Sequence, residues 1–460
     1  MHKTISLAAF LPSVIFPVAI FVIGLRNPSI FDAPALLKIS PFPAIFYILA
    51  FSIILIFPQR SALLKENSKG LILFLLFTLG YFFMASILNK TSLNTNNIYF
   101  EADSKSWTQR MSGADGWNTG LRAVHPFIYP MFRPLVAFLS ILTSGDRFYA
   151  NLILLATAGG GCVFLMWKII HWMTENQTYA ILSASLLGVS TSHIIFSSAV
   201  ETYIFSAFFL LLFIWLLLTN KFPYLLVIVS VATLGITITN VIQQGLAHLF
   251  VQKNLKRSII IFSLVLGCSV CLNFIVKLVY PATDYFFIPQ NLAREQQFSQ
   301  GINIKRIGLV TENFFIYNIT APQPYFSIHN ERPKLNFLPG TIQNYVWFGW
   351  LSLILWSATL VLTFIYFFSR DYPQKYNGLL ISMSACLLFN FLLHAGYGSE
   401  PFLYTADWTY ALILIIAIIL QNAAKHPWFL VMWFFFVMSI LINNLWVLYF
   451  IARQVGTHLV

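Results

Sequence analysis

The chain has 460 residues, of which 58% are hydrophobic and only 9% are charged, and its mean hydropathy is +0.76. This composition excludes an ordinary soluble domain and indicates a polytopic membrane protein. The formal net charge is +12, but the basic residues are dispersed in short segments between apolar runs, which argues against a nucleic-acid-binding surface.

The apolar runs predict an all-α membrane protein with about thirteen transmembrane helices in a single domain over residues 1–460. The first run, roughly Ile5–Leu25, lacks a small-residue cleavage site, so we expect a retained signal anchor. Most runs can cross a bilayer of about 30 Å at about 1.5 Å per residue. The later spans are expected at 41–58, 70–88, 148–170, 178–198, 202–219, 222–238, 239–251, 258–280, 344–368, 376–396, 407–421 and 428–450. The pair 222–238 and 239–251 could instead form one bent helix.

Basic residues in the short loops set the expected orientation. If all of them are cytoplasmic, every alternate loop is external, without contradiction along the chain. Both long loops, 89–147 and 281–343, then lie outside and are expected to carry short surface helices. We therefore expect a multi-pass protein of a bacterial plasma membrane with its active site on the extracytoplasmic face. The basic residues concerned are Arg60, Lys65, Lys69, Lys221, Lys253, Lys256, Arg257, Arg370, Lys375 and Lys425.

An ATP-driven activity is disfavoured by the sequence. The predicted cytoplasmic loops are too short for a nucleotide-binding domain, and no GxxxxGK[ST] motif occurs. Three consecutive glycines, Gly159–Gly161, lie in an apolar span, where they favour close helix packing over phosphate binding. The four cysteines also lie in apolar runs, which predicts buried side chains, and the CxxC spacing of Cys268 and Cys271 has no second pair beside it. Any external activity must therefore use an ion gradient or an already activated substrate.

The few charged side chains are concentrated in the segment Glu101–Leu135. Asp103 precedes SKSWTQRM, which is expected to form a short amphipathic helix along the membrane surface. Because Asp is a favoured N-cap residue, capping is an alternative role for Asp103. The prolines at 126, 130 and 134 are expected to break any long helix that follows. Arg133 stands in an apolar context and needs a partner, for which a phosphate or a carboxylate is suited.

Several polar residues near predicted span ends are expected on the same side of the membrane. They come from distant parts of the sequence, so a shared hydrated cavity is one interpretation and separate snorkelling to the interface is the other. These residues are Glu201, Asn240, Gln243, Gln244, Lys277, Glu400 and Asp407. The loop 281–343 mixes cations with aromatic side chains and is expected to cover the cavity as a lid, although an ordinary external loop would have a similar composition.

The layout of the first long loop resembles the GT-C membrane glycosyltransferases, which include protein O-mannosyltransferases and lipid A aminoarabinose transferases. The shared features are an acidic residue in the first large external loop, a short surface helix and an HP motif before the next span. The stretches ETYIFSAFFLLL and EPFLYTADW are similar to bacterial members, and the resemblance covers about residues 70–420. Two features depart from the family. About two spans precede this loop, and Asp103 is followed by Ser104 where the O-mannosyltransferases have an Asp-Glu pair, which argues against a protein acceptor.

The resemblance implies an inverting transfer of a sugar from a polyprenyl-phosphate donor to a lipid, glycan or protein acceptor outside the membrane. It assigns the general base to Asp103. Cations that stabilise the leaving phosphate are then expected at Arg122, Arg133 and Arg306. Glu101, His125, Glu201 and Glu400 are expected to bind the acceptor or line the cavity, although a structural role for His125 stays open. No cofactor or metal site is expected, and a requirement for a divalent cation is left open.

Two other classes of function remain as alternatives. A secondary transporter or lipid flippase would place charges near the bilayer midplane, on broken helices with internal repeat symmetry. No clear repeat relates the two halves of this sequence, and its ionisable residues gather at one interface. A ligase or polymerase of surface glycans would also use long external loops that contain arginine and histidine.

Overall fold

The computed structural model describes residues 7–32, 36, 41–56, 62–91, 93–220, 223–329 and 332–458. Among them, six helices are long and apolar enough to cross a membrane, which confirms the expectation of an all-α membrane protein. The count of about thirteen spans stays a prediction. The six helices are α5 (Ala62–Leu88), α8 (Arg147–Thr174), α14 (Leu255–Val279), α17 (Trp347–Phe368), α18 (Asn377–Gly396) and α20 (Pro427–His458).

Shorter helices fill most of the remaining predicted spans. They are α2 (Leu11–Leu25), α4 (Pro41–Ile56), α9 (Gln177–Val189), α10 (Thr191–Phe196), α11 (Tyr203–Thr219), α12 (Pro223–Ile236), α13 (Asn240–Gln252) and α19 (Ala406–Ile419). The segment 222–251 therefore forms two helices. The span expected at 178–198 is also two helices, because Ser190 is extended between α9 and α10. The N–H groups released by this break, at Thr191 and Ser192, donate to the carbonyls of Ile319 and Asn318.

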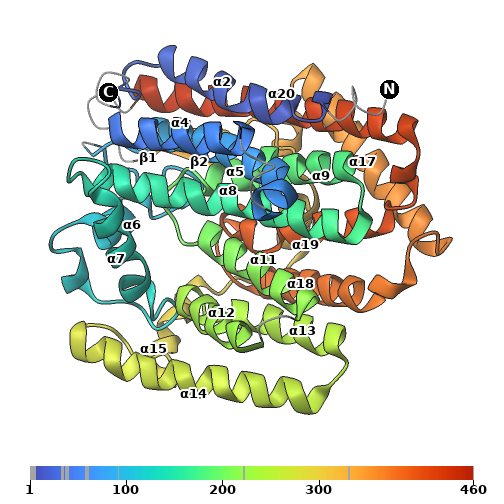
Figure 1. The fold of residues 1–460 in the computed structure, drawn as a ribbon. Coiled ribbons are helices and arrows are strands. Elements are labelled where there is room, and N and C mark those ends of the chain that lie inside the picture. Colours follow the sequence, from blue (N-terminus) through green and yellow to red (C-terminus); the bar gives the residue numbers. More distant parts are fainter. Residues whose placement is uncertain are drawn as a thin grey trace.

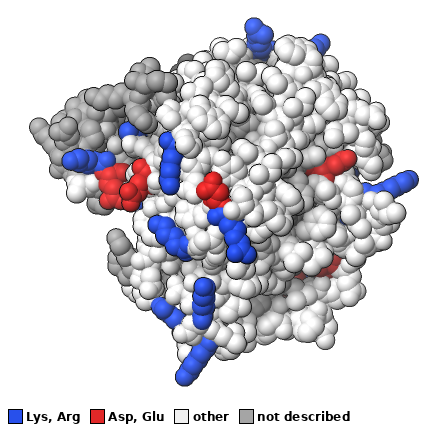
Figure 2. Space-filling model, turned by 90° about the vertical axis from the view of Figure 1, so that its right-hand side faces the viewer, with Lys and Arg blue, Asp and Glu red and all other residues white. Residues whose placement is uncertain are grey.

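The helices run roughly side by side, and α6, α7, α15 and the strands gather at one end of the bundle (Figure 1). Short turns such as the one between α13 and α14 lie at the opposite end (Figure 1). Figure 2 shows that opposite end, where Lys and Arg side chains are spread over the surface among fewer Asp and Glu side chains. Which face of the bundle is cytoplasmic stays a prediction from the basic loops. Arg60 and Lys221, which also entered the orientation argument, lie outside the described residues.

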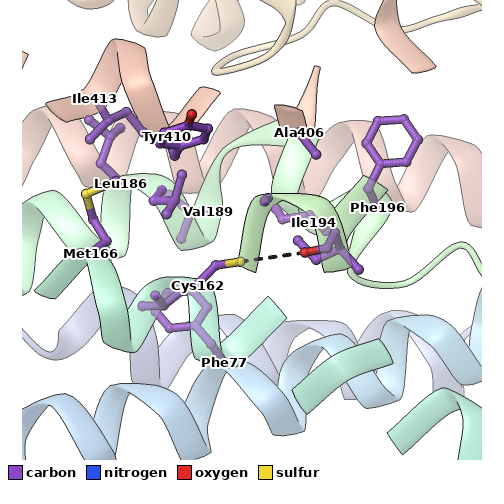
Figure 3. Packing of buried hydrophobic residues seen from close by; sticks show 14 of the residues in the cluster. Phe77, Cys162, Met166, Leu186, Val189, Ile194, Phe196, Ala406, Tyr410 and Ile413 are labelled. Atoms are coloured by element: carbon purple, nitrogen blue, oxygen red, sulfur yellow. Dashed lines mark hydrogen bonds between the residues drawn. The ribbon is translucent and has the colours of Figure 1, made fainter. Parts of the chain in front are cut away.

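Close packing of α8 against α5, α11 and the segment after α10 explains the three consecutive glycines. A Cβ atom at Gly160 would lie 2.1 Å from Thr78 Oγ1, and one at Gly159 would lie 2.2 Å from Ser197 Oγ. The surrounding core contains Phe77, Met166 and Leu186 (Figure 3). In the same core, the Cys162 thiol is directed at the carbonyl oxygen of Ile204, 3.9 Å away (Figure 3). The glycines therefore serve helix packing, as expected.

Two of the four cysteines contradict the expectation of burial. Cys162 and Cys386 are buried, but Cys268 and Cys271 are exposed on α14. The same helix exposes large apolar side chains such as Leu264 and Leu278. In a membrane protein an apolar side chain can face lipid as well as the core, so apolar surroundings in the sequence do not predict burial.

The first long loop forms α6 (Ser104–Ser112), η1 (Gly116–Thr119) and α7 (Ile128–Ser140). The expectation that the prolines at 126, 130 and 134 break a helix in this segment is wrong for α7, which contains both Pro130 and Pro134. Pro130 lies in the first turn, where its missing N–H would have no partner inside the helix. Only Pro134 therefore costs a helical hydrogen bond.

The second long loop crosses over the first. Its elements are α15 (Pro289–Leu292), η2 (Ala293–Phe298), α16 (Ile304–Glu312), η3 (Asn313–Tyr317), β1 (Tyr325–His329), β2 (Arg332–Asn336) and η4 (Thr341–Asn344). The strands pair in antiparallel register, with Phe326 opposite Leu335. Leu335 also exchanges backbone hydrogen bonds of 2.9 Å with Ile98 and Phe100 of the first loop. These bonds fix the two loops against each other around one cavity.

Candidate functional site

A cavity of about 520 Å³ lies where the two long loops meet the ends of α11, α13, α18 and α19. Its rim includes exposed side chains such as Asn97, Asp103 and Ser399, whereas Asn240, Asn390 and Asp407 at its other end are buried. Its charged lining residues are Glu101, Asp103, Arg110, Arg122, Glu201, Glu295 and Asp407. The cavity therefore combines carboxylates and guanidinium groups in a chain that is otherwise poor in charge.

Asp103 occupies the N-cap position of α6, but its side chain makes no capping hydrogen bond. Asn96 satisfies the start of the helix instead. Its Oδ1 accepts from the N–H of Ser106 at 2.9 Å, and its Nδ2 donates to the Ser106 hydroxyl at 2.8 Å. The Asp103 side chain therefore does not cap α6, and its carboxylate faces the cavity.

A second carboxylate lies directly beside Asp103. Glu201, which is buried, accepts a hydrogen bond from the N–H of Asp103 at 2.6 Å and another from Thr202 at 3.1 Å. Burial, reinforced by the charge of Asp103, raises the pKa of Glu201 to about 8. Partial desolvation also raises the pKa of Asp103, although the charges of Arg110 and Arg122 oppose this shift. Near neutral pH the pair therefore holds an ionised Asp103 next to a protonated Glu201.

Arg122 connects the two loops by a bidentate ion pair with Glu295 of η2. The hydroxyl of Tyr397 donates to the same carboxylate at 2.7 Å, and the Arg122 guanidinium lies over Phe298, with Cζ 5.2 Å from the ring centroid. Burial alone would raise the pKa of Glu295, but the hydrogen bonds from Arg122 and Tyr397 outweigh it and lower that pKa. Glu295 is therefore ionised and bound to the cation that faces the cavity.

His125 lines the cavity as a neutral imidazole. Its Nδ1 lies 2.5 Å from the carbonyl oxygen of Ile236, and its ring meets Trp107 edge to face with centroids 5.3 Å apart. Burial lowers the pKa of His125 to about 4. Because a carbonyl only accepts, Nδ1 must carry the proton, which leaves Nε2 as an acceptor.

The segment around His125 satisfies the break between α12 and α13. The N–H of Phe127 donates to Gly235 at 2.9 Å, and the N–H of Ile238 donates to Val124 at 3.2 Å. Irregular backbone at the depth of a membrane needs such partners, because lipid supplies none. The HP motif thus holds the short α12–α13 hairpin whose turn lines the cavity.

Three of the predicted site residues do not line the cavity. Arg133 donates to the carbonyls of Arg110 and Gly113 at 2.6 and 3.0 Å, at the end of α6. Arg306 donates to the carbonyls of His394 and Ser399 at 2.7 and 2.9 Å. Glu400 is buried at the start of η6 (Pro401–Tyr404), where it accepts from the N–H of Phe402. All three side chains hold backbone groups.

The other predicted site residues meet at the cavity, which brings together Glu101, Asp103, Arg122, His125 and Glu201. Glu101 is also paired with Lys334 of β2 at 3.0 Å. From the polar residues near the span ends, Asn240 and Asp407 line the cavity as well.

Gln243, Gln244 and Lys277 do not line the cavity. The Gln243 amide bonds to Asn240 at 3.0 Å, the Gln244 amide bonds to Thr233 at 2.7 Å, and the Lys277 ammonium bonds to the Thr283 carbonyl at 2.8 Å. Sequence reasoning missed Glu295 and Tyr397. Nothing local distinguishes Glu295 from other polar residues of its loop, and only its position opposite Arg122 reveals its role.

Among the described residues, no group of three or more His, Cys, Asp or Glu side chains is arranged to hold a metal ion. Comparisons with protein-family models, with curated proteins and with solved structures found no match to this chain.

Proposed function

We propose that the protein is an integral membrane glycosyltransferase that moves a sugar from a polyprenyl-phosphate donor to an acceptor on the extracytoplasmic face, with inversion. The observation that carries this proposal is the Asp103 carboxylate. It stands at a helix start without capping it, faces a cavity that also contains Arg110 and Arg122, and has a protonated neighbour in Glu201. A free carboxylate opposite guanidinium groups suits the transfer of a proton and the departure of an anion in one step.

In the proposed reaction the acceptor hydroxyl attacks the anomeric carbon of the donor sugar and loses its proton to Asp103. The bond between the anomeric carbon and the phosphate oxygen breaks, and polyprenyl phosphate leaves with the electron pair. Attack opposite the leaving group inverts the anomeric centre. Arg110 and Arg122 stabilise the charge that grows on the phosphate. Nε2 of His125 accepts a hydrogen bond from the incoming acceptor.

Glu201 serves this reaction as a positioning residue. Its bond to the N–H of Asp103 fixes the start of α6, and its protonated state adds no second negative charge beside the base. Had both carboxylates been ionised, their repulsion would raise the basicity of Asp103 at the cost of a less stable loop. The neutral neighbour thus keeps Asp103 ionised at neutral pH.

A path for the prenyl tail is supported by exposed apolar surface on α14 and on α7, which packs against α6. α7 exposes Phe138, α14 exposes Leu278 and Val279, and α12 contacts both helices. Such side chains face lipid in a membrane, so a tail can lie along them while its phosphate enters between the loops.

The test uses the full-length protein in lipid nanodiscs with radiolabelled polyprenyl-phosphate sugars and a crude envelope fraction as the acceptor source. The proposal expects release of polyprenyl phosphate and label in the acceptor, both abolished by Asp103→Asn. Binding of the lipid without cleavage, with transport of the intact lipid across a vesicle membrane, would replace the proposal by a flippase.

A further inference from the structure

The buried end of the cavity has a chemistry that the proposed reaction does not use. Asp407 and Asn240 both line it, with only 3% and 1% of their surfaces exposed. Asp407 lies in the first turn of α19, and Asn240 is the first residue of α13. Two polar side chains from distant parts of the chain thus meet where solvent scarcely reaches.

Each of these side chains has a buried polar atom without a hydrogen-bond partner among the described residues. The Asn240 amide lies beside the Asp407 carboxylate and stabilises it. Hydrogen-bond geometry is nevertheless not met, so Asp407 Oδ1 and Asn240 Nδ2 are both unpaired. A buried donor and a buried acceptor that are left unpaired are costly, and a ligand that pairs with both recovers that cost.

Two side chains that do not line the cavity, Gln243 and Tyr410, fix the orientation of the Asn240 amide. Its Oδ1 accepts from Gln243 Nε2 at 3.0 Å, and the side-chain oxygen Oε1 of Gln243 accepts from the Tyr410 hydroxyl at 3.0 Å. The Tyr410 ring and Ala406 pack in the core, which anchors α19 next to Asp407 (Figure 3). The unpaired Nδ2 of Asn240 is therefore held in one orientation, because turning the amide over would break the bond that Oδ1 accepts from Gln243.

No arginine among the described lining residues forms an ion pair with Asp407. Of the two arginines among the described lining residues, Arg122 is engaged by Glu295, and Arg110 lies over Trp107 with its Cζ 5.0 Å from the ring centroid. Asp407 instead lies at the positive end of α19 and beside the positive end of α13, which stabilise a carboxylate. The subsite therefore does not need a cationic ligand for charge balance.

We propose that this buried end is a subsite for one hydroxyl group of the donor's sugar, and that the sugar is neutral; this inference rests on the proposed function. A hydroxyl donates to Asp407 Oδ1 and accepts from Asn240 Nδ2 at once, whereas an ammonium group would leave the Asn240 donor unpaired. Tyr203 lines the cavity together with Glu201 and Asp407, so the subsite belongs to the same cavity as the pair of carboxylates at the reaction centre.

An aromatic wall completes the subsite. The ring of His394 stacks on Tyr404 with centroids 4.3 Å apart and planes inclined by 24°, and both residues line the cavity. Apolar ring faces next to fixed polar groups suit a sugar, which has C–H faces and equatorial or axial hydroxyls. Together these groups make Asp407 and Asn240 specificity-determining residues, because a site built to bond a hydroxyl rejects an analogue that lacks it.

The test measures equilibrium binding by the full-length protein in nanodiscs, in an Asp103→Asn background that blocks turnover. The probes are polyprenyl phosphate, polyprenyl-phosphate gluco-, manno- and galactohexoses, their monodeoxy analogues, and one 4-amino sugar. We expect one hexose to bind at least tenfold tighter than bare polyprenyl phosphate, and one of its deoxy analogues to lose that gain. Asp407→Leu should remove the gain for the intact hexose while leaving the affinity for polyprenyl phosphate unchanged.

Two controls separate this inference from loss of fold and from failure of the proposed function. Asp407→Asn keeps the side-chain shape and should weaken the hexose preference less than Asp407→Leu does. Glu400→Gln alters another buried carboxylate that does not line the cavity, and it should leave the preference intact. An unchanged preference in Asp407→Leu, or tighter binding of the amino sugar than of every neutral hexose, would overturn the subsite. Failure of all the lipids to bind would instead overturn the proposed function.

Discussion

The N–H of Asp103 donates a hydrogen bond to the carboxylate of Glu201, with Asp103 N and Glu201 Oε1 2.6 Å apart. Residue 103 starts a helix in a loop, whereas Glu201 precedes α11, so this bond joins the loop to the helix bundle. It also couples the protonation of two carboxylates that the sequence separates by almost a hundred residues. Glu201 is therefore expected to affect both the stability and the pH dependence of the site.

We predict that Glu201→Gln changes the dependence of thermal stability on pH. The pKa of Glu201 is about 8 in the folded protein and lies near its ordinary value of 4.5 when the chain unfolds. A raised pKa contributes stability that is complete below pH 4.5 and is lost as the pH rises towards 8. The Glu201→Gln variant has no titrating carboxyl group at this position, so its stability does not show this loss as the pH rises. Its melting temperature, relative to that of the unaltered protein, should therefore rise steadily between pH 5 and pH 8. A constant difference across that range would show that Glu201 does not titrate there.

We predict opposite effects for the two partners of the ion pair between the loops. Arg122→Ala removes a cation from the cavity and should weaken the binding of polyprenyl phosphate at least tenfold. Glu295→Gln removes the competing carboxylate and should strengthen that binding, because Arg122 is then free to bond the phosphate. The exposed pair of Arg294 and Asp284 provides a matched control, and Arg294→Gln should change nothing. Weaker binding in Glu295→Gln would mean that the pair only holds the loops together.

Arg133 is predicted to act on stability and not on the donor. Its guanidinium bonds two carbonyls at the end of α6, so Arg133→Ala should cost about 1–3 kcal/mol of unfolding free energy. Affinity for polyprenyl phosphate should remain within about threefold of the unaltered protein once the variant is folded. Titration at a temperature well below its melting point separates the two effects. A loss of affinity as large as that of Arg122→Ala would return Arg133 to the phosphate site.

The helices could be predicted from the sequence because apolar runs of sufficient length have few alternatives in a membrane. The breaks within these runs could not be predicted from the sequence. Ser190 ends α9 because backbone groups of residues 318 and 319, far away in the sequence, offer partners to the next turn. The exposure of Cys268 was missed for a related reason, since hydropathy does not distinguish a lipid-facing side chain from a core one.

The site was predictable in part. The concentration of charge around Asp103 and the polar span ends at Glu201, Asn240 and Asp407 indicated residues that do line one cavity. Arg133, a cation in apolar surroundings, and Arg306, a cation of the second long loop, were both expected at the donor phosphate, but backbone carbonyls satisfy them. A sequence shows that such a cation needs a partner without showing whether the partner is a ligand or the chain itself. Glu295 faces Arg122 only through the folding of two loops, which no local pattern reveals.

The central prediction separates catalysis from helix capping at Asp103 by a pair of matched variants. Because Asn96 bonds the first turn of α6, Asn96→Ala should lower the free energy of unfolding by about 1 kcal/mol. Asp103→Asn should leave it nearly unchanged, since the Asp103 side chain makes no capping bond.

Activity should respond in the reverse order. Asp103→Asn cannot accept the proton of the acceptor, so transfer should fall by about two to four orders of magnitude, while donor binding persists. Asn96→Ala should retain most transfer at a temperature where it is folded. Melting curves and initial rates from the same nanodisc preparations give both readouts. Full transfer by a folded Asp103→Asn protein would exclude Asp103 as the base and direct attention to Glu101, another carboxylate that lines the cavity.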